Sequence, residues 1–122
     1  MKFSIFTILF SLLLSQNEVC FQIENNPYPN SSALGCFTKY VNVLDCFEIY
    51  AESSISDEKV LHAASIAAEL LDNDENGEVD DIVLKNILSE YDALMPIFSS
   101  EWSQAANNFM NNYEGEGASA AL

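Results

Sequence analysis

The chain has 122 residues, a length that predicts one small domain. It carries four lysines, no arginine and 19 acidic residues, which give a formal net charge of -15. Nucleic acid is therefore a poor partner, because contacts with phosphate need Lys and Arg, and docking on an anionic membrane surface is disfavoured for the same reason.

The N-terminus has the layout of a secretory signal peptide. Lys2 supplies a positive charge, residues 5–14 are almost wholly apolar, and polar residues follow from Ser15. This apolar run is too short for an ordinary transmembrane helix, which favours a cleaved leader over an uncleaved anchor. We expect a signal peptide over residues 1–15, and a mature chain that is secreted and has no membrane contact after cleavage.

The next segment, residues 16–39, is expected to be rich in loops, because residues 25–32 concentrate turn-forming side chains. Asn30 begins a sequon for N-glycosylation, which is modified only in a host that glycosylates and is otherwise an ordinary loop. In an oxidising compartment Cys20, Cys36 and Cys46 can form one disulfide bond. The third thiol is then buried, intermolecular or paired with sequence outside this chain.

Residues 40–51 predict extended structure. Val41, Val43, Phe47 and Ile49 alternate with other residues along this stretch, and β-branched and aromatic side chains favour a strand over a helix. Asp45 interrupts the apolar set and marks a turn or a bulge.

The stretch from Asp57 to Leu71 predicts a helix. Ser56 can cap its N-terminus, and two acids in the first turn favour that end of a helix. Apolar residues cover most of its circumference and leave one narrow polar stripe, so we expect this helix to be mostly buried.

A second helix is predicted from about Asp80 to the residue before Pro96, which stops it. Its apolar side chains recur at helical spacing and form a single face: Leu84, Ile87, Leu88, Tyr91, Leu94 and Met95.

A third helix is predicted from Ser99 or Ser100 to about Asn111, with Trp102 and Phe109 in the core. Residues 113–122 are expected to be a flexible tail or a truncated end. Residues 40–112 thus predict a small, mainly α-helical domain with minor β structure. Its architecture is an EF-hand-like helix-loop-helix with a short preceding β element and a third helix.

The loop between the first two helices, residues 72–83, carries the predicted chemistry. Calcium takes six to eight oxygen ligands, and a compact loop supplies them from alternate positions. Side chains serve at the first, third and fifth positions, a backbone carbonyl at the seventh, and a side chain or bound water at the ninth. The predicted metal ligands are, in that order, Asp72, Asp74, Asn76, Glu78 and Asp80.

Two further positions decide how good this calcium site is. Gly77 at the sixth position permits the sharp turn. Val83 stands at the twelfth position, where a bidentate Glu or Asp would complete the site. The gap predicts weak calcium affinity, with water, Asp81 or a distant carboxylate as the substitute. The alternatives are an acidic turn without an ion and, less favoured, a magnesium site, since magnesium binds through fewer protein ligands.

The stretches Leu61 to Ala64, Ala68 to Gly77 and Asp80-Asp81 carry a resemblance. They are similar to a family of largely uncharacterised secreted proteins, in which a His-Ala-Ala helix runs into a Leu-Asp-Asn-Asp-x-(Asp or Asn)-Gly loop. The resemblance covers residues 40–95. It implies an EF-hand-like calcium loop and a chain that continues past the equivalent of Leu122, and it supplies no activity.

Two functions follow from these patterns. The first is a secreted, acidic, calcium-binding module with a structural or interaction role. The alternative is the N-terminal part of a longer secreted enzyme, such as a metallohydrolase, whose catalytic residues lie outside this chain, because no catalytic motif is present here. His62, with Glu58 and Glu69, offers too few ligands for a transition metal and is more simply a solvated helix residue.

Overall fold

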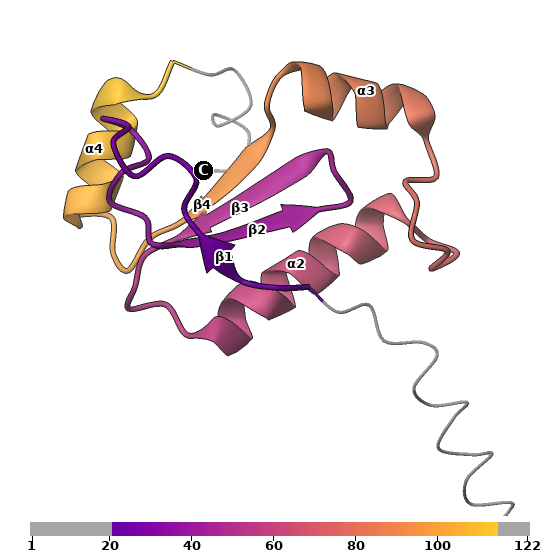
Figure 1. The fold of residues 1–122 in the computed structure, drawn as a ribbon, viewed down its shortest axis with the longest axis horizontal. Coiled ribbons are helices and arrows are strands. Elements are labelled where there is room, and N and C mark those ends of the chain that lie inside the picture. The colour runs from indigo at the N-terminus through magenta and orange to yellow at the C-terminus, as the bar shows by residue number, and fades with distance from the viewer. Residues whose placement is uncertain (1–20, 115–122) are drawn as a thin grey trace, which may run out of the picture.

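The structure is a computed structural model that describes residues 21–114. The predicted signal peptide over residues 1–15, Cys20 and residues 115–122 of the predicted tail lie outside the described residues. Within the described range, one sheet has four strands in the order β1-β2-β3-β4, and three helices accompany it (Figure 1). Among these residues no helix is both long and apolar enough to cross a membrane.

The sheet is built around a β-hairpin. β2 (Lys39–Val43) and β3 (Phe47–Ala51) pair antiparallel, and the two-residue strand β1 (Glu24–Asn25) adds to the outer edge of β2. Asp45 lies in the connecting turn with a φ of 58°, and its backbone N–H donates to Asn42 Oδ1 at 2.9 Å. The prediction of extended structure over residues 40–51, interrupted at Asp45, is confirmed.

The predicted fold class is wrong, because the domain is α+β and not mainly α. The second helix, α3 (Ile82–Glu90), ends before the predicted stop at Pro96. Asp92 then has a φ of 49°, and the chain continues as β4 (Leu94–Ile97), parallel to β3. β4 is an edge strand, where a proline without an N–H is tolerated.

The alternation of β4 explains why the helical prediction failed there. Successive side chains of a strand point to opposite faces of a sheet. Leu94 accordingly packs in the cluster on one face, while Met95 packs against the cluster on the other. A helix would have placed both residues on its single apolar face. The sequence alone cannot tell these two arrangements apart, because a short apolar run fits a helix and a strand equally well.

Two separate apolar clusters cover the two faces of the sheet. On one face α2 (Asp57–Leu71) packs Val60 and Ala64 against β2 and β3. On the other face α4 (Gln104–Asn112) packs Phe109 near Phe37 and Tyr50. The ring centroids of Phe37 and Phe109 lie 6.2 Å apart in an edge-to-face arrangement. The sheet is therefore the centre of the molecule, and α2 and α4 cover its two faces.

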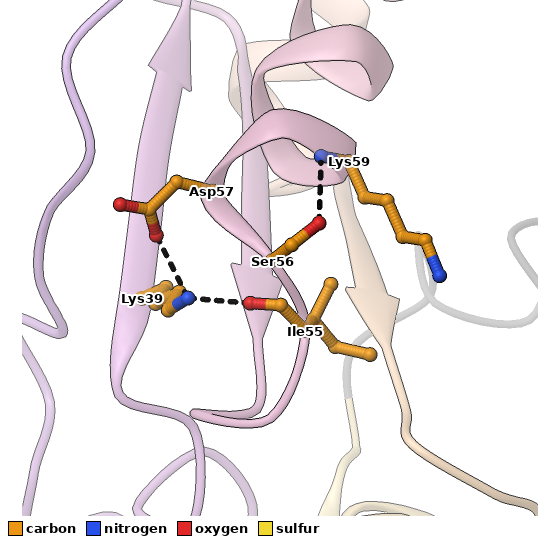
Figure 2. Close-up of polar contacts among 5 residues, drawn as sticks. All are labelled: Lys39, Ile55, Ser56, Asp57 and Lys59. Atoms are coloured by element: carbon orange, nitrogen blue, oxygen red, sulfur yellow. Dashed lines mark hydrogen bonds and ion pairs between the residues drawn. The ribbon is translucent and has the colours of Figure 1, made fainter.

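Helix α2 has the predicted bounds, and its start is well defined by polar contacts (Figure 2). The Ser56 hydroxyl accepts a hydrogen bond from the Lys59 backbone N–H at 3.3 Å, as expected of a capping residue. Lys39 Nζ lies 2.7 Å from the Asp57 carboxylate and also donates to the Ile55 carbonyl. The lysine thus ties the first strand of the hairpin to the beginning of the helix.

Burial of the helices differs from the prediction. Only Val60 and Ala64 of α2 are buried, so the expectation of a mostly buried helix is wrong. α3 has no buried residue at all. Trp102 precedes α4 and is 79% exposed, so it does not belong to the core, whereas Phe109 does. α3 belongs to neither of the two apolar clusters.

The remaining predictions from the N-terminal segment fall on an ordered loop. Asn30 lies exposed in a turn, and its glycosylation stays a prediction. Cys36 and Cys46 are free thiols, half-buried and buried respectively. The predicted disulfide therefore does not join these two, and Cys20 is outside the described residues.

Candidate metal-binding loop

The loop starts where α2 ends. The backbone N–H of Asp72 donates to the Ala68 carbonyl at 2.8 Å, the last helical hydrogen bond of α2. At the other end of the loop the Asp80 N–H donates to the Leu71 carbonyl at 2.9 Å, and this hydrogen bond holds the two ends of the loop together. Figure 1 shows the result: α2 lies low in the view, α3 lies high, and the loop joins them at the right.

Three of the predicted ligands converge inside this loop. One oxygen from each of Asp72, Asp74 and Asp80 lies within 4.8 Å of the others. Oxygens that bind one calcium ion at 2.3–2.6 Å can be at most about 5.2 Å apart. The three carboxylates are thus close enough to share an ion, although exposed acidic groups also gather without one.

Asp72 is the anchor of this arrangement. It is only 4% exposed, although it is an ionisable residue in a surface loop. Its carboxylate accepts hydrogen bonds from the backbone N–H of Gly77 at 2.7 Å and of Asn76 at 3.2 Å. These bonds wrap the chain around the carboxylate, and they give each of its two oxygens a donor that burial would otherwise deny it.

Gly77 is required for its backbone conformation. Its φ is 87°, in the region that residues with a Cβ rarely adopt. A Cβ placed at Gly77 would meet nothing within 4 Å, so space does not explain the glycine. The turn therefore depends on the torsion, as the sequence predicted for the sixth position.

Of the other two predicted ligands, Asn76 contacts the carboxylate cluster through its side chain and Glu78 does not. Asn76 Nδ2 donates to Asp74 at 3.3 Å, and Asn76 Oδ1 accepts from the Glu78 N–H at 2.9 Å. Asn76 is thus in place next to the cluster. The Glu78 side chain is exposed and is not part of the carboxylate group. The proposal that its backbone carbonyl is a ligand remains a prediction.

The twelfth position is occupied by a side chain in solvent. Val83 is the second residue of α3 and is 63% exposed. Asp81, the nearby substitute considered above, caps α3, because its Oδ1 accepts from the N–H of Val83 at 2.9 Å and of Leu84 at 3.2 Å. This role could have been recognised from an acid that directly precedes a helical apolar run.

The two carboxyls nearest each other have opposite pKa shifts. Burial raises the pKa of Asp72, but hydrogen bonds from the Asp74 carboxyl and from the amides of Gly77, Asn76 and Glu75 outweigh it and lower the pKa. The pKa of Asp74 is raised, first by its hydrogen bond to Asp72. Two carboxylates this close repel each other, and a proton or a cation between them relieves the repulsion.

A second polar cluster lies on the sheet, away from the loop. Glu48 accepts hydrogen bonds from the hydroxyls of Tyr40 at 3.1 Å and Tyr50 at 3.0 Å. Burial, followed by the charge of Glu48, raises the pKa of Tyr40 to about 12 and raises that of Tyr50 still more. Sequence reasoning placed these three residues only in a strand and did not foresee their contact.

His62 is exposed on α2 and lies outside the carboxylate cluster. Comparison with models of protein families, with curated proteins and with solved structures finds no match for this chain. The resemblance to secreted proteins with a His-Ala-Ala helix therefore stays a prediction.

Proposed function

We propose that this protein is a secreted, acidic module that binds one calcium ion weakly in the loop between α2 and α3. The carrying observation is the convergence of Asp72, Asp74 and Asp80 within 4.8 Å of one another. Asn76 Oδ1 and the Glu78 carbonyl would add two oxygens, and water would complete the six to eight that calcium takes. These are the five ligands that the spacing of the loop predicts.

Weak binding is compatible with an extracellular role. The missing carboxylate at Val83 puts the expected dissociation constant at about 10⁻⁴ to 10⁻³ M, the range of extracellular calcium modules. The net charge of -15 adds a general attraction for cations.

The role of the ion would be structural. α3 has no buried residue, so packing in the core does not fix its position, and the loop joins its N-terminus to α2. Calcium held by residues 72–80 would fix the direction in which the chain enters α3 through Asp81. The ion would therefore act on an exposed connection and not between two buried helices, because neither helix is mostly buried.

Calorimetric titration with calcium tests the proposal. Asp74→Asn removes one exposed ligand without touching the core, and it should weaken binding about tenfold, or about 1.4 kcal/mol in binding free energy. Glu101→Gln removes the same charge from an exposed site outside the loop and should leave calcium affinity unchanged.

Thermal unfolding with and without calcium is a second test. A ligand with a dissociation constant of about 1 mM that binds only the folded state adds about 1.4 kcal/mol of stability at 10 mM calcium. For a domain of this size that corresponds to a rise of about 5–10 °C in melting temperature. A melting temperature that is indifferent to calcium, or equal calcium affinity in both variants, would refute the proposed function.

A further inference from the structure

The surface around α3 is unusually apolar. Four of its side chains are large, hydrophobic and exposed: Ile82, Val83, Leu84 and Ile87. On the neighbouring end of α2, Ile66 and Leu70 are exposed as well. Single exposed hydrophobic residues are normal, whereas exposed hydrophobic residues that gather in one patch are typical of an interaction site.

Two of these side chains, Leu70 and Leu84, line a groove. A cavity of about 220 Å³ lies between the C-terminal end of α2, the beginning of β3 and the inner side of α3. All the side chains that line this α3 groove are apolar: Phe47, Ala67, Leu70, Leu71, Leu84 and Leu88. Such a lining would accept one or two aliphatic or aromatic side chains and gives no polar group to orient a small polar ligand.

Both ends of the α3 groove are acidic. One end adjoins the metal-binding loop, where the exposed acids are Asp74, Glu75, Glu78, Asp80 and Asp81. At the other end the groove shares Phe47 and Leu88 with a second cavity of about 110 Å³. That cavity is also lined by Asp45, Glu48 and Asp92. Between residues 72 and 92 the only basic side chain is Lys85.

We propose that the α3 groove binds a basic amphipathic helical segment of another protein. Apolar side chains on one face of the segment would fill the groove, and Lys or Arg on its flanks would meet the two acidic ends. The combination of an apolar centre and like-charged ends specifies the partner more closely than either feature alone.

Charge also disfavours the other occupants. A second copy of this chain would bring the same acidic ends together in a molecule that already has a net charge of -15. An anionic lipid surface would be repelled in the same way. A basic segment is the occupant that gains from both the apolar and the electrostatic contacts.

Polarisation of a fluorescently labelled synthetic peptide provides the test. The probe is a Leu–Lys amphipathic helix without tryptophan, measured at physiological ionic strength, and a Leu–Glu helix of the same length is its control. We expect the Leu–Lys peptide to bind and Leu84→Gln or Leu70→Gln to weaken binding about tenfold. Leu70 is 77% exposed, so Leu70→Gln should leave the fold intact, whereas Leu84 is 39% exposed and Leu84→Gln should lower stability without unfolding the domain. Trp102→Gln, an exposed apolar residue outside the groove, is the matched control and should leave affinity unchanged.

Several outcomes would overturn this proposal. The proposal is wrong if the Leu–Lys peptide does not bind, or if the Leu–Glu peptide binds as tightly as the Leu–Lys peptide. It is also wrong if Trp102→Gln loses as much affinity as the two leucine variants. Sedimentation that shows a dimer in the original protein and a monomer in Leu84→Gln would assign the groove to a second copy. Preferential binding to anionic vesicles would assign it to lipid.

The result is separable from the proposed calcium site. Asp74→Asn should impair calcium binding and change peptide affinity by no more than about twofold, because it removes one of several charges at that end. Leu70→Gln should do the opposite. The groove lining contains no proposed calcium ligand, so either proposal can fail while the other stands.

Discussion

Three leucines test whether α3 is outside the core and β4 inside it. Leu94 on β4 is 3% exposed, Leu84 on α3 is 39% exposed and Leu70 on α2 is 77% exposed. Replacing each by alanine removes the same atoms, so the differences in unfolding free energy report burial. The sequence pattern places Leu84 and Leu94 on one helical face and predicts similar losses for the two.

The magnitudes follow from the exposed fractions. A leucine-to-alanine change takes away about 2.4 kcal/mol of transfer free energy when the side chain is fully buried. Leu94→Ala also leaves a cavity between the sheet and the Phe109 cluster, which brings the expected loss to about 3–4 kcal/mol. Scaled by burial, Leu84→Ala should lose about 1.5 kcal/mol and Leu70→Ala about 0.5 kcal/mol.

Urea unfolding followed by far-UV circular dichroism measures this series. Trp102 fluorescence is unsuitable as the probe, because the indole is already exposed in the folded state. The denaturant dependence of the free energy should stay unchanged while the midpoint moves. Equal losses for Leu84→Ala and Leu94→Ala would refute the assignment of residues 94–97 to a strand and would restore the longer helix.

Three further predictions address the loop and the sheet. Val83→Glu should tighten calcium binding about tenfold by adding the missing bidentate ligand, while Val83→Gln should leave the affinity unchanged. If calorimetry finds no gain in calcium affinity for Val83→Glu, this position does not face the ion. Gly77→Ala should lower the unfolding free energy by about 1–2 kcal/mol in urea, because a Cβ strains a φ of 87°; an unchanged midpoint would contradict the turn. Above pH 10 the unfolding free energy should fall, because Tyr40, whose pKa is raised to about 12, keeps its proton in the folded protein and loses it in the unfolded chain. Phenolate absorbance should show that Tyr40 and Tyr50 ionise at higher pH than an exposed tyrosine. Tyr50→Phe should reduce this loss of stability.

Tyr40 holds its proton more tightly in the folded protein than in the unfolded chain, because its pKa is raised. A pKa that is higher in the folded state means that the folded protein binds more protons between about pH 10 and 12. Raising the pH through this window therefore favours the unfolded state. Stability that rises over the same window would contradict the burial of these hydroxyls beside Glu48.

Local sequence patterns determined the helix α2 and most of the loop. The Ser56 hydroxyl and the acids after it act within one turn, so the start of α2 could be predicted from neighbours alone. The positive φ of Gly77 and the closeness of Asp72, Asp74 and Asp80 likewise come from alternation within a short, closed loop. These features involve residues that are near in sequence, and propensity and spacing describe such contacts well.

Tertiary structure decided the remainder. Whether residues 94–97 form a strand depends on pairing with β3, for example Leu94 with Glu48, far away in the sequence. α3, whose apolar residues share a predicted helical face with Leu94, has no buried residue, so a helix with an apolar face lies outside the core. Periodicity shows which residues can share a face. Only the long-range arrangement of the sheet decides whether that face is covered, and here it produced both the exposed helix and the α3 groove.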